Sequence, residues 1–149
     1  MPPFERTLYA RWGDMDFNGH MKNTAYLDAG ADVRMMFFAD HGFSMREFEK
    51  RRIGPVILRD ELEYFRELRL LEPVRVTLMI AGLSEDGARF RMRNEFFRAD
   101  GERAARVTST GGWLDLGTRR LTAPPEDLNA AMQQLVRSED FEVLRVSAR

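Results

Sequence analysis

The chain is 149 residues long, carries 23 basic and 24 acidic side chains, and contains no cysteine. Its formal net charge of −1 gives no indication of a nucleic-acid or anionic membrane partner. The lack of cysteine excludes disulfides, thiolate metal sites and cysteine nucleophiles. With 44% apolar residues, the sequence predicts one globular domain over residues 1–149 with a substantial core.

The N-terminal residues and the apolar runs show no targeting or membrane signal. The start, MPPFERTLYARW, lacks the basic region followed by an apolar stretch that marks a signal peptide. No apolar run approaches the roughly 18–20 residues that a helix needs to cross a bilayer. We therefore expect a cytoplasmic protein with neither a membrane nor a nucleic-acid partner.

The first half of the chain predicts a strand followed by a long helix. Most alternate positions from Phe4 to Trp12 are apolar, which is the period of a half-buried strand. The period becomes helical over residues 24–41, and Gly42 supplies a residue favoured just beyond a helix C-terminus. Residues 44–52 predict a short second helix.

The remaining sequence predicts four strands and a final helix. The strand-like segments cover residues 55–68, 74–83, 88–99 and 103–116 and are joined mainly by short turns. Residues 124–136 predict a helix begun by proline. This order favours an α+β fold, an antiparallel sheet with a helix across one face. The tail after residue 137 leaves a further strand, an intersubunit contact and a frayed end as alternatives.

The short run DMDFNGHMKN, residues 14–23, matches the opening of a calcium-binding loop. The twelfth position of such a loop would be Ala25, which offers no side-chain oxygen, and the preceding segment is strand-like instead of helical. Zinc is no better supported, because only His20 and His41 are available and their spacing resembles no zinc site. The sequence therefore predicts no metal and no cofactor.

The longer segment RWGDMDFNGHMKNTAYLDAG resembles the signature of hotdog-fold acyl-CoA thioesterases, in the 4-hydroxybenzoyl-CoA thioesterase-like branch. In that signature a strand leads through Asp-x-Asp-x-x-Gly-His-x-x-Asn-x-x-Tyr into a long central helix. The matching positions of this chain are Asp14, Asp16, Gly19, His20, Asn23 and Tyr26. The resemblance covers residues 5 to about 135. It implies a five-stranded antiparallel sheet wrapped around one long central helix, with a C-terminal helix.

The activity that the resemblance implies is hydrolysis of an acyl-CoA or acyl-carrier-protein thioester. A thioester carbonyl needs an activated oxygen nucleophile and a donor for the developing oxyanion. Asp16 is the candidate nucleophile or general base, and the resemblance assigns the oxyanion donor to the backbone N–H of Asn23, which is also a natural helix N-cap. His20 is a catalytic candidate that binds substrate or orients Asp16, with a structural role as the alternative. Asp14 is expected to fix the turn.

Gly19, Tyr26 and Arg89 are the candidate substrate-binding residues. Gly19 allows backbone or substrate to approach closely, and Tyr26 belongs to the motif. Arg89 begins a row of alternating arginines, and a guanidinium suits the phosphates of CoA. Such a row is more commonly a solvated strand face, which is the alternative here.

The resemblance also implies a homodimer or homotetramer whose sites lie where protomers meet. An exposed strand edge in an isolated sheet invites pairing, which supports that expectation. Two other functions remain open: an acyl-CoA-binding hotdog protein without turnover, and a hydroxyacyl-thioester dehydratase. The dehydratase is disfavoured because the sequence lacks the helix pattern of such enzymes.

Overall fold

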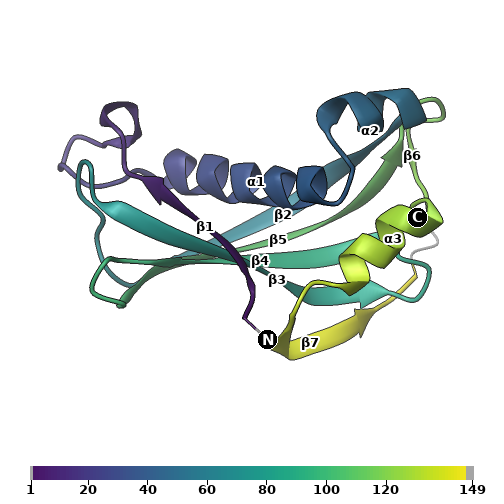
Figure 1. Cartoon of the computed structure of the whole chain (residues 1–149). Coiled ribbons are helices and arrows are strands. Elements are labelled where there is room, and N and C mark those ends of the chain that lie inside the picture. Colours follow the sequence, from purple (N-terminus) through teal and green to yellow (C-terminus); the bar gives the residue numbers. More distant parts are fainter. Residues whose placement is uncertain (1, 147–149) are drawn as a thin grey trace.

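A long helix lies across one face of a curled sheet in the computed structural model, which describes residues 2–146 (Figure 1). The elements in chain order are β1 Phe4–Tyr9, the 3-10 helix η1 Trp12–Asp14, α1 Asn23–Asp40, α2 Met45–Arg51, β2 Ile53–Tyr64, β3 Pro73–Ser84, β4 Arg89–Phe97, β5 Arg103–Asp115, β6 Arg120–Leu121, α3 Glu126–Gln133 and β7 Arg137–Leu144. None of the helices within residues 2–146 is long and apolar enough to span a membrane.

The sheet follows the order β1-β3-β4-β5-β2, and these five strands pair antiparallel. β1 covers the first half of β3, from Phe4 opposite Leu78 to Tyr9 opposite Pro73. β7 then pairs parallel with the second half of β3, beginning at Ile80, and the short β6 pairs with β5. The predicted antiparallel strands are therefore present, but the described sheet has seven strands instead of five.

Of the alternatives that the sequence left open for the tail, a further strand is present: β7. Arg91 on β4 pairs with Glu142 at 2.5 Å, and Arg93 pairs with Asp140 at 2.8 Å. The side chain of Arg93 is only 12% exposed, so the prediction of a solvated arginine row is wrong for this residue. The last residues of the tail, 147–149, lie outside the described part of the chain.

The central helix α1 closely matches its predicted span of 24–41. It runs from Asn23 to Asp40 and is followed by Gly42, whose φ of +88° favours glycine. The helix approaches the sheet closely at Gly30, where an added Cβ would lie 2.7 Å from Oδ1 of Asn94 on β4. The close packing of helix on sheet therefore depends on a residue without a side chain.

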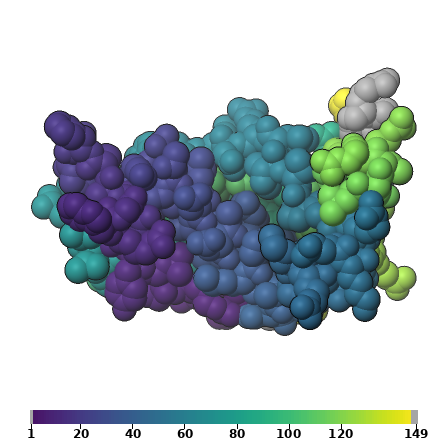
Figure 2. Space-filling view, turned by 90° about the horizontal axis from the view of Figure 1, so that it is seen from above, coloured from purple at the N-terminus to yellow at the C-terminus, as the bar shows by residue number. Residues whose placement is uncertain are grey.

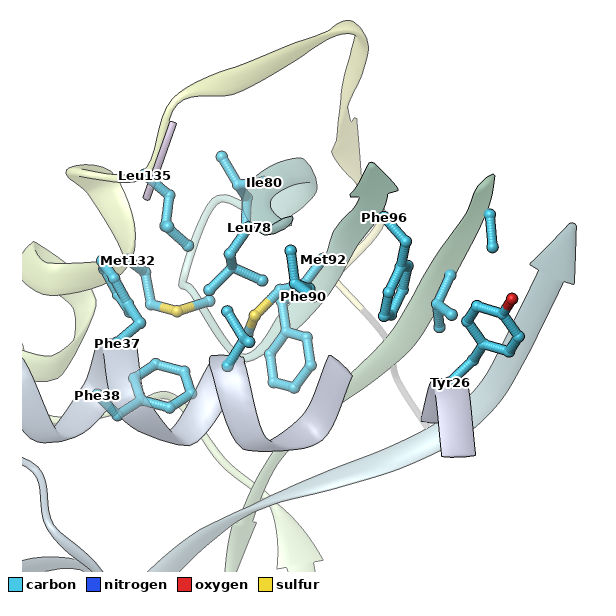
Figure 3. Close-up of a cluster of buried hydrophobic side chains, with 14 of the residues drawn as sticks. Tyr26, Phe37, Phe38, Leu78, Ile80, Phe90, Met92, Phe96, Met132 and Leu135 are labelled. Atoms are coloured by element: carbon cyan, nitrogen blue, oxygen red, sulfur yellow. The ribbon is translucent and has the colours of Figure 1, made fainter. Parts of the chain in front are cut away.

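Aromatic side chains fill the core at the C-terminal end of α1. Trp113 on β5 is fully buried, and its ring centroid lies 5.4 Å from Phe38, 5.8 Å from Phe48 and 5.4 Å from Phe90. Met132 from α3 reaches the same core beside Phe38 (Figure 3). Helices from both halves of the chain thus pack against the sheet near the C-terminal end of α1.

The N-terminal strand is shorter than its apolar alternation predicts. β1 ends at Tyr9, and the chain turns through η1, which leaves Trp12 81% exposed. The expectation that Trp12 continues the buried face of the strand is therefore wrong. Seen from above, the purple first part of the chain covers the left half of the near face, and the green residues of the α3 region lie at the right end (Figure 2).

Candidate functional site

A tight turn connects η1 to α1 and carries the motif carboxylates. The N–H of Asp16 donates to the carbonyl of His20 at 2.7 Å, and the N–H of Gly19 donates to the carbonyl of Asp16 at 3.2 Å. Gly19 has φ +79°, a left-handed conformation that glycine adopts without steric cost. The glycine of the motif is therefore required by the turn itself.

Asp16 lies exposed on this turn and accepts hydrogen bonds from the main chain. Its Oδ1 receives the N–H of His20 at 3.0 Å and that of Asn18 at 2.8 Å. These bonds, the one from His20 foremost, stabilise the anion and hold the pKa of Asp16 below its ordinary value. Among residues 2–146, no hydrogen bond reaches Oδ2, so one carboxylate oxygen stays available for chemistry.

Asp14 has a different environment and a different set of contacts. It is buried, and its carboxylate receives the main-chain N–H of Arg11 at 2.9 Å together with two guanidinium hydrogen bonds. Burial by itself would raise the pKa of Asp14, but the hydrogen bonds and charge of Arg11 outweigh it and lower the pKa. The carbonyl of Asp14 also accepts the N–H of Lys22 at 2.8 Å. Asp14 thus holds the turn against the start of α1.

The N-terminus of α1 presents an unpaired main-chain donor. Lys22 is the N-cap, with no side-chain capping bond, and Asn23 is the first helical residue. The interpretation of Asn23 as N-cap is therefore wrong, because the extended residue before the helix is Lys22. In the described part of the chain the N–H of Asn23 has no partner, and it lies at the positive end of the helix dipole.

Asp16 and Asn23 line the same open cleft, which has a volume of about 500 Å³. Its walls are the motif turn, the first residues of α1, and residues 64–67 at the end of β2 and in the following loop. The chemistry that this arrangement offers is a carboxylate and an N–H donor beside one cavity. This arrangement does not require a metal ion held between Asp14 and Asp16, because the carboxylate of Asp14 is hydrogen-bonded to the guanidinium of Arg11.

Tyr26 lies in the inner wall of the cleft and is almost completely buried. Its ring packs edge-on against Tyr64 at 5.7 Å and against Phe96 at 5.2 Å, the latter visible in Figure 3. Burial, followed by the charges of Tyr64, Glu72 and Asp16, raises the pKa of Tyr26 to about 12. The phenol is therefore neutral at physiological pH.

The cleft also contains a contact that the sequence reasoning missed. Nε2 of His20 lies 2.6 Å from a carboxylate oxygen of Glu67, which belongs to the loop between β2 and β3. No local sequence pattern indicates a role for Glu67, because this residue is distant in sequence from the motif and follows an ordinary strand. Only the packing of that loop against the turn brings the two side chains together.

The remaining candidates lie apart from the cleft. Gly19 faces a second hollow of about 560 Å³, which Asp16 also lines. Arg89 is paired with Gly112 at the far end of β4, roughly 20 Å along the strand from Phe96, which contacts Tyr26. Within the described chain, the cleft thus brings together Asp16, His20, Asn23 and Tyr26 and leaves Gly19 and Arg89 outside.

The family model of the thioesterase-like superfamily matches residues 10–132, so the chain belongs to this family. The match covers the motif turn, α1 and all the antiparallel strands from β2 to β5, and it begins just after β1. It confirms the resemblance on which the sequence-based expectations rested. No curated protein sequence matches the chain.

Solved structures show the same fold. The hypothetical protein SAV2348 from Staphylococcus aureus, solved in complex with CoA, is 26% identical with a TM-score of 0.81, over 89% of this chain and 82% of that chain. Slr0204, a 1,4-dihydroxy-2-naphthoyl-CoA thioesterase from Synechocystis, is 15% identical with a TM-score of 0.79, over 90% and 98%. YbaW, a probable thioesterase from Escherichia coli, is 19% identical with a TM-score of 0.75, over 89% and 98%. The α+β fold of this chain is therefore the hotdog fold.

Proposed function

We propose that the protein hydrolyses an acyl thioester of coenzyme A, or of an acyl carrier protein, to a carboxylic acid and a free thiol. The observation that carries this proposal is the shared cleft of Asp16 and the unpartnered N–H of Asn23. Membership of the thioesterase-like superfamily supports it, and the CoA held by the Staphylococcus aureus neighbour supports coenzyme A as the carrier.

Two routes lead from this geometry to the products. With Asp16 as general base, water attacks the carbonyl carbon, its proton passes to the carboxylate, and the C–S bond then breaks to release a thiolate that takes up the proton. With Asp16 as nucleophile, its oxygen displaces the thiolate to form a mixed anhydride, which water hydrolyses. In both routes the oxyanion accepts the N–H of Asn23, which the helix dipole reinforces. The lowered pKa of Asp16 keeps it anionic for either role.

The working form is proposed to be a homodimer or a homotetramer. In the described sheet β2 is a terminal strand that pairs only with β5, and it exposes Leu58 and Tyr64. An open edge of this length is a template for pairing with a second copy. The cleft lies beside this edge, since Tyr64 ends β2 and lines the cleft. In this proposal Arg89 reaches a cleft only if another protomer contributes it.

The test of the proposed function is thiol release from a panel of acyl-CoAs by the wild type and by Asp16→Asn. The absence of cysteine makes a thiol reagent suitable, because the protein contributes no background. We expect the wild type to hydrolyse at least one acyl-CoA and Asp16→Asn to lose about 100- to 10,000-fold in kcat while still binding substrate.

Two results would redirect the proposal. A folded wild type that binds acyl-CoAs and releases no thiol would support the non-catalytic acyl-CoA-binding hotdog protein. Full activity in Asp16→Asn would retain the thioesterase and reject Asp16 as its nucleophile or base. The hydroxyacyl-thioester dehydratase would be recognised by formation of an enoyl product without thiol release.

A further inference from the structure

The contact between His20 and Glu67 joins the motif turn to the loop after β2 across the cleft. Nε2 of His20 and Oε2 of Glu67 lie 2.6 Å apart, and both side chains line the cleft that holds Asp16. The two side chains are 36% and 48% exposed, so they are accessible to solvent and to a substrate. The contact is therefore part of the site and not of the core.

The loop that carries Glu67 is anchored on both sides of the carboxylate. Nη2 of Arg69 donates to the second carboxylate oxygen of Glu67 at 3.2 Å, and Nη1 of Arg98 donates to its carbonyl at 3.3 Å. The next residue, Leu68, is fully buried, and its carbonyl accepts the N–H of Met21 at 2.9 Å. Glu67 is thus offered to His20 from a fixed backbone.

His20 is in turn the residue whose main chain holds Asp16 by hydrogen bonds. Its main-chain N–H donates to Oδ1 of Asp16, and its carbonyl accepts the N–H of Asp16. The side chain of the same residue contacts Glu67, so His20 links the loop after β2 to Asp16. The series of contacts runs from Arg69 through Glu67 and His20 to the candidate catalytic carboxylate.

We propose that Glu67 is a positioning residue for the thioesterase reaction: its contact with the imidazole anchors His20, whose main chain holds Asp16. This inference rests on the proposed function, because it assigns a role in that same reaction. Displacement of a catalytic group by a change outside the chemistry costs up to about 100-fold in rate. We therefore expect Glu67→Ala to lose about 10- to 100-fold in kcat with little change in KM.

A matched control is available in the same region. Glu102 is also a half-exposed glutamate, 56% against 48%, and it also accepts an arginine hydrogen bond at 3.2 Å, from Arg66. It differs in lacking contact with His20 and in lying outside the cleft lining. Exposed ion pairs contribute little to stability, so Glu67→Ala and Glu102→Ala should unfold like the wild type. Their activities should differ, because only Glu67→Ala is expected to lower kcat.

The experiment measures kcat and KM for the wild type, Glu67→Ala, Glu67→Gln, Glu102→Ala, His20→Ala and the His20→Ala/Glu67→Ala double variant, with the best acyl-CoA of the panel. We expect Glu67→Gln, which keeps an acceptor oxygen, to fall between the wild type and Glu67→Ala. In the double variant the two losses should not multiply, because Glu67 acts only through His20. Nitrogen-15 NMR of the imidazoles, with only two histidines in the chain, reports whether Nε2 of His20 is protonated.

The outcomes separate this inference from the proposed function. An active wild type with unchanged kcat in Glu67→Ala would overturn the positioning role and leave the thioesterase intact. Equal losses in Glu67→Ala and Glu102→Ala, or losses that multiply in the double variant, would also overturn it. A wild type that hydrolyses no thioester would overturn both proposals, even where the NMR spectrum of His20 responds to Glu67→Ala.

Discussion

The two ends of α1 are built in opposite ways. At its N-terminus the helix begins at Asn23 without a side-chain cap, beside an open cleft and an exposed carboxylate, Asp16. At its C-terminus Phe38 is fully buried and packs against Phe48 and Trp113. One end is polar and open to solvent, and the other is apolar and closed.

The difference indicates how one helix can provide stability at one end and, in the proposed function, chemistry at the other. An unpaired N–H and a poorly capped first turn destabilise a helix, since capping typically contributes about 1 kcal/mol. The aromatic packing at the other end compensates, because burying large side chains is the main source of stability. In the proposed function, the closed end fixes the helix so that the open end can present the N–H of Asn23 to a substrate.

The largest expected change is at the closed end. Trp113→Ala should lower the free energy of unfolding by about 3–5 kcal/mol, because a fully buried indole leaves a cavity among aromatic rings. Trp12→Ala is the control: that side chain is 81% exposed, and the loss should stay within about 0.5 kcal/mol. Denaturant unfolding measures both values. Equal losses of unfolding free energy in the two variants would contradict the interpretation that packing around Trp113 stabilises the closed end of α1.

The next effect is at the open end and concerns activity. Asn23→Pro removes the main-chain N–H at the first helical position, where proline is well tolerated, and Lys22 before it is already extended, with φ −85° and ψ 160°. We expect kcat to fall about 100- to 1,000-fold with the helix intact by circular dichroism. Asn23→Ala keeps the N–H and should keep most of the activity. Unchanged turnover in Asn23→Pro would place the oxyanion donor elsewhere.

The smallest expected effect lies at the middle of the helix, between the two ends. Gly30→Ala adds a Cβ 2.7 Å from Oδ1 of Asn94 and should cost about 1–3 kcal/mol through overpacking. Gly13→Ala is the control, because nothing lies within 4 Å of its added Cβ, and its change should stay within about 0.5 kcal/mol. Thermal unfolding compares them, and a stable Gly30→Ala would mean that the helix can shift on the sheet.

Much of the fold could be predicted because its signals are local. The helical period placed α1 at 24–41, against Asn23–Asp40 in the structure, and alternation found the strands of the antiparallel sheet. The parallel pairing of β7 with β3 was not predictable, because it depends on residues far apart in the sequence. The exposure of Trp12 was missed for a related reason: the chain leaves the sheet at Tyr9, although the apolar alternation continues.

The candidate site likewise contains residues whose placement was predictable from local sequence and one, Arg89, whose placement was not. The motif brought Asp16, His20 and Asn23 to one cleft, since a turn of a few residues before a helix leaves little freedom for their placement. Arg89 was chosen for its chemistry alone, and the length of β4 separates it from the cleft within the described chain. Its role in binding CoA stays a prediction.

The sequence by itself determined the helix, the antiparallel strands and the turn that carries Asp16, because periodicity, glycine and short spacing act within a few residues of one another. Only the tertiary structure decided that β7 covers Arg93, that Gly30 lies against Asn94, and that Glu67 meets His20. Each of these contacts joins segments that are distant in the chain, and their geometry is set by how the loops and the sheet pack together.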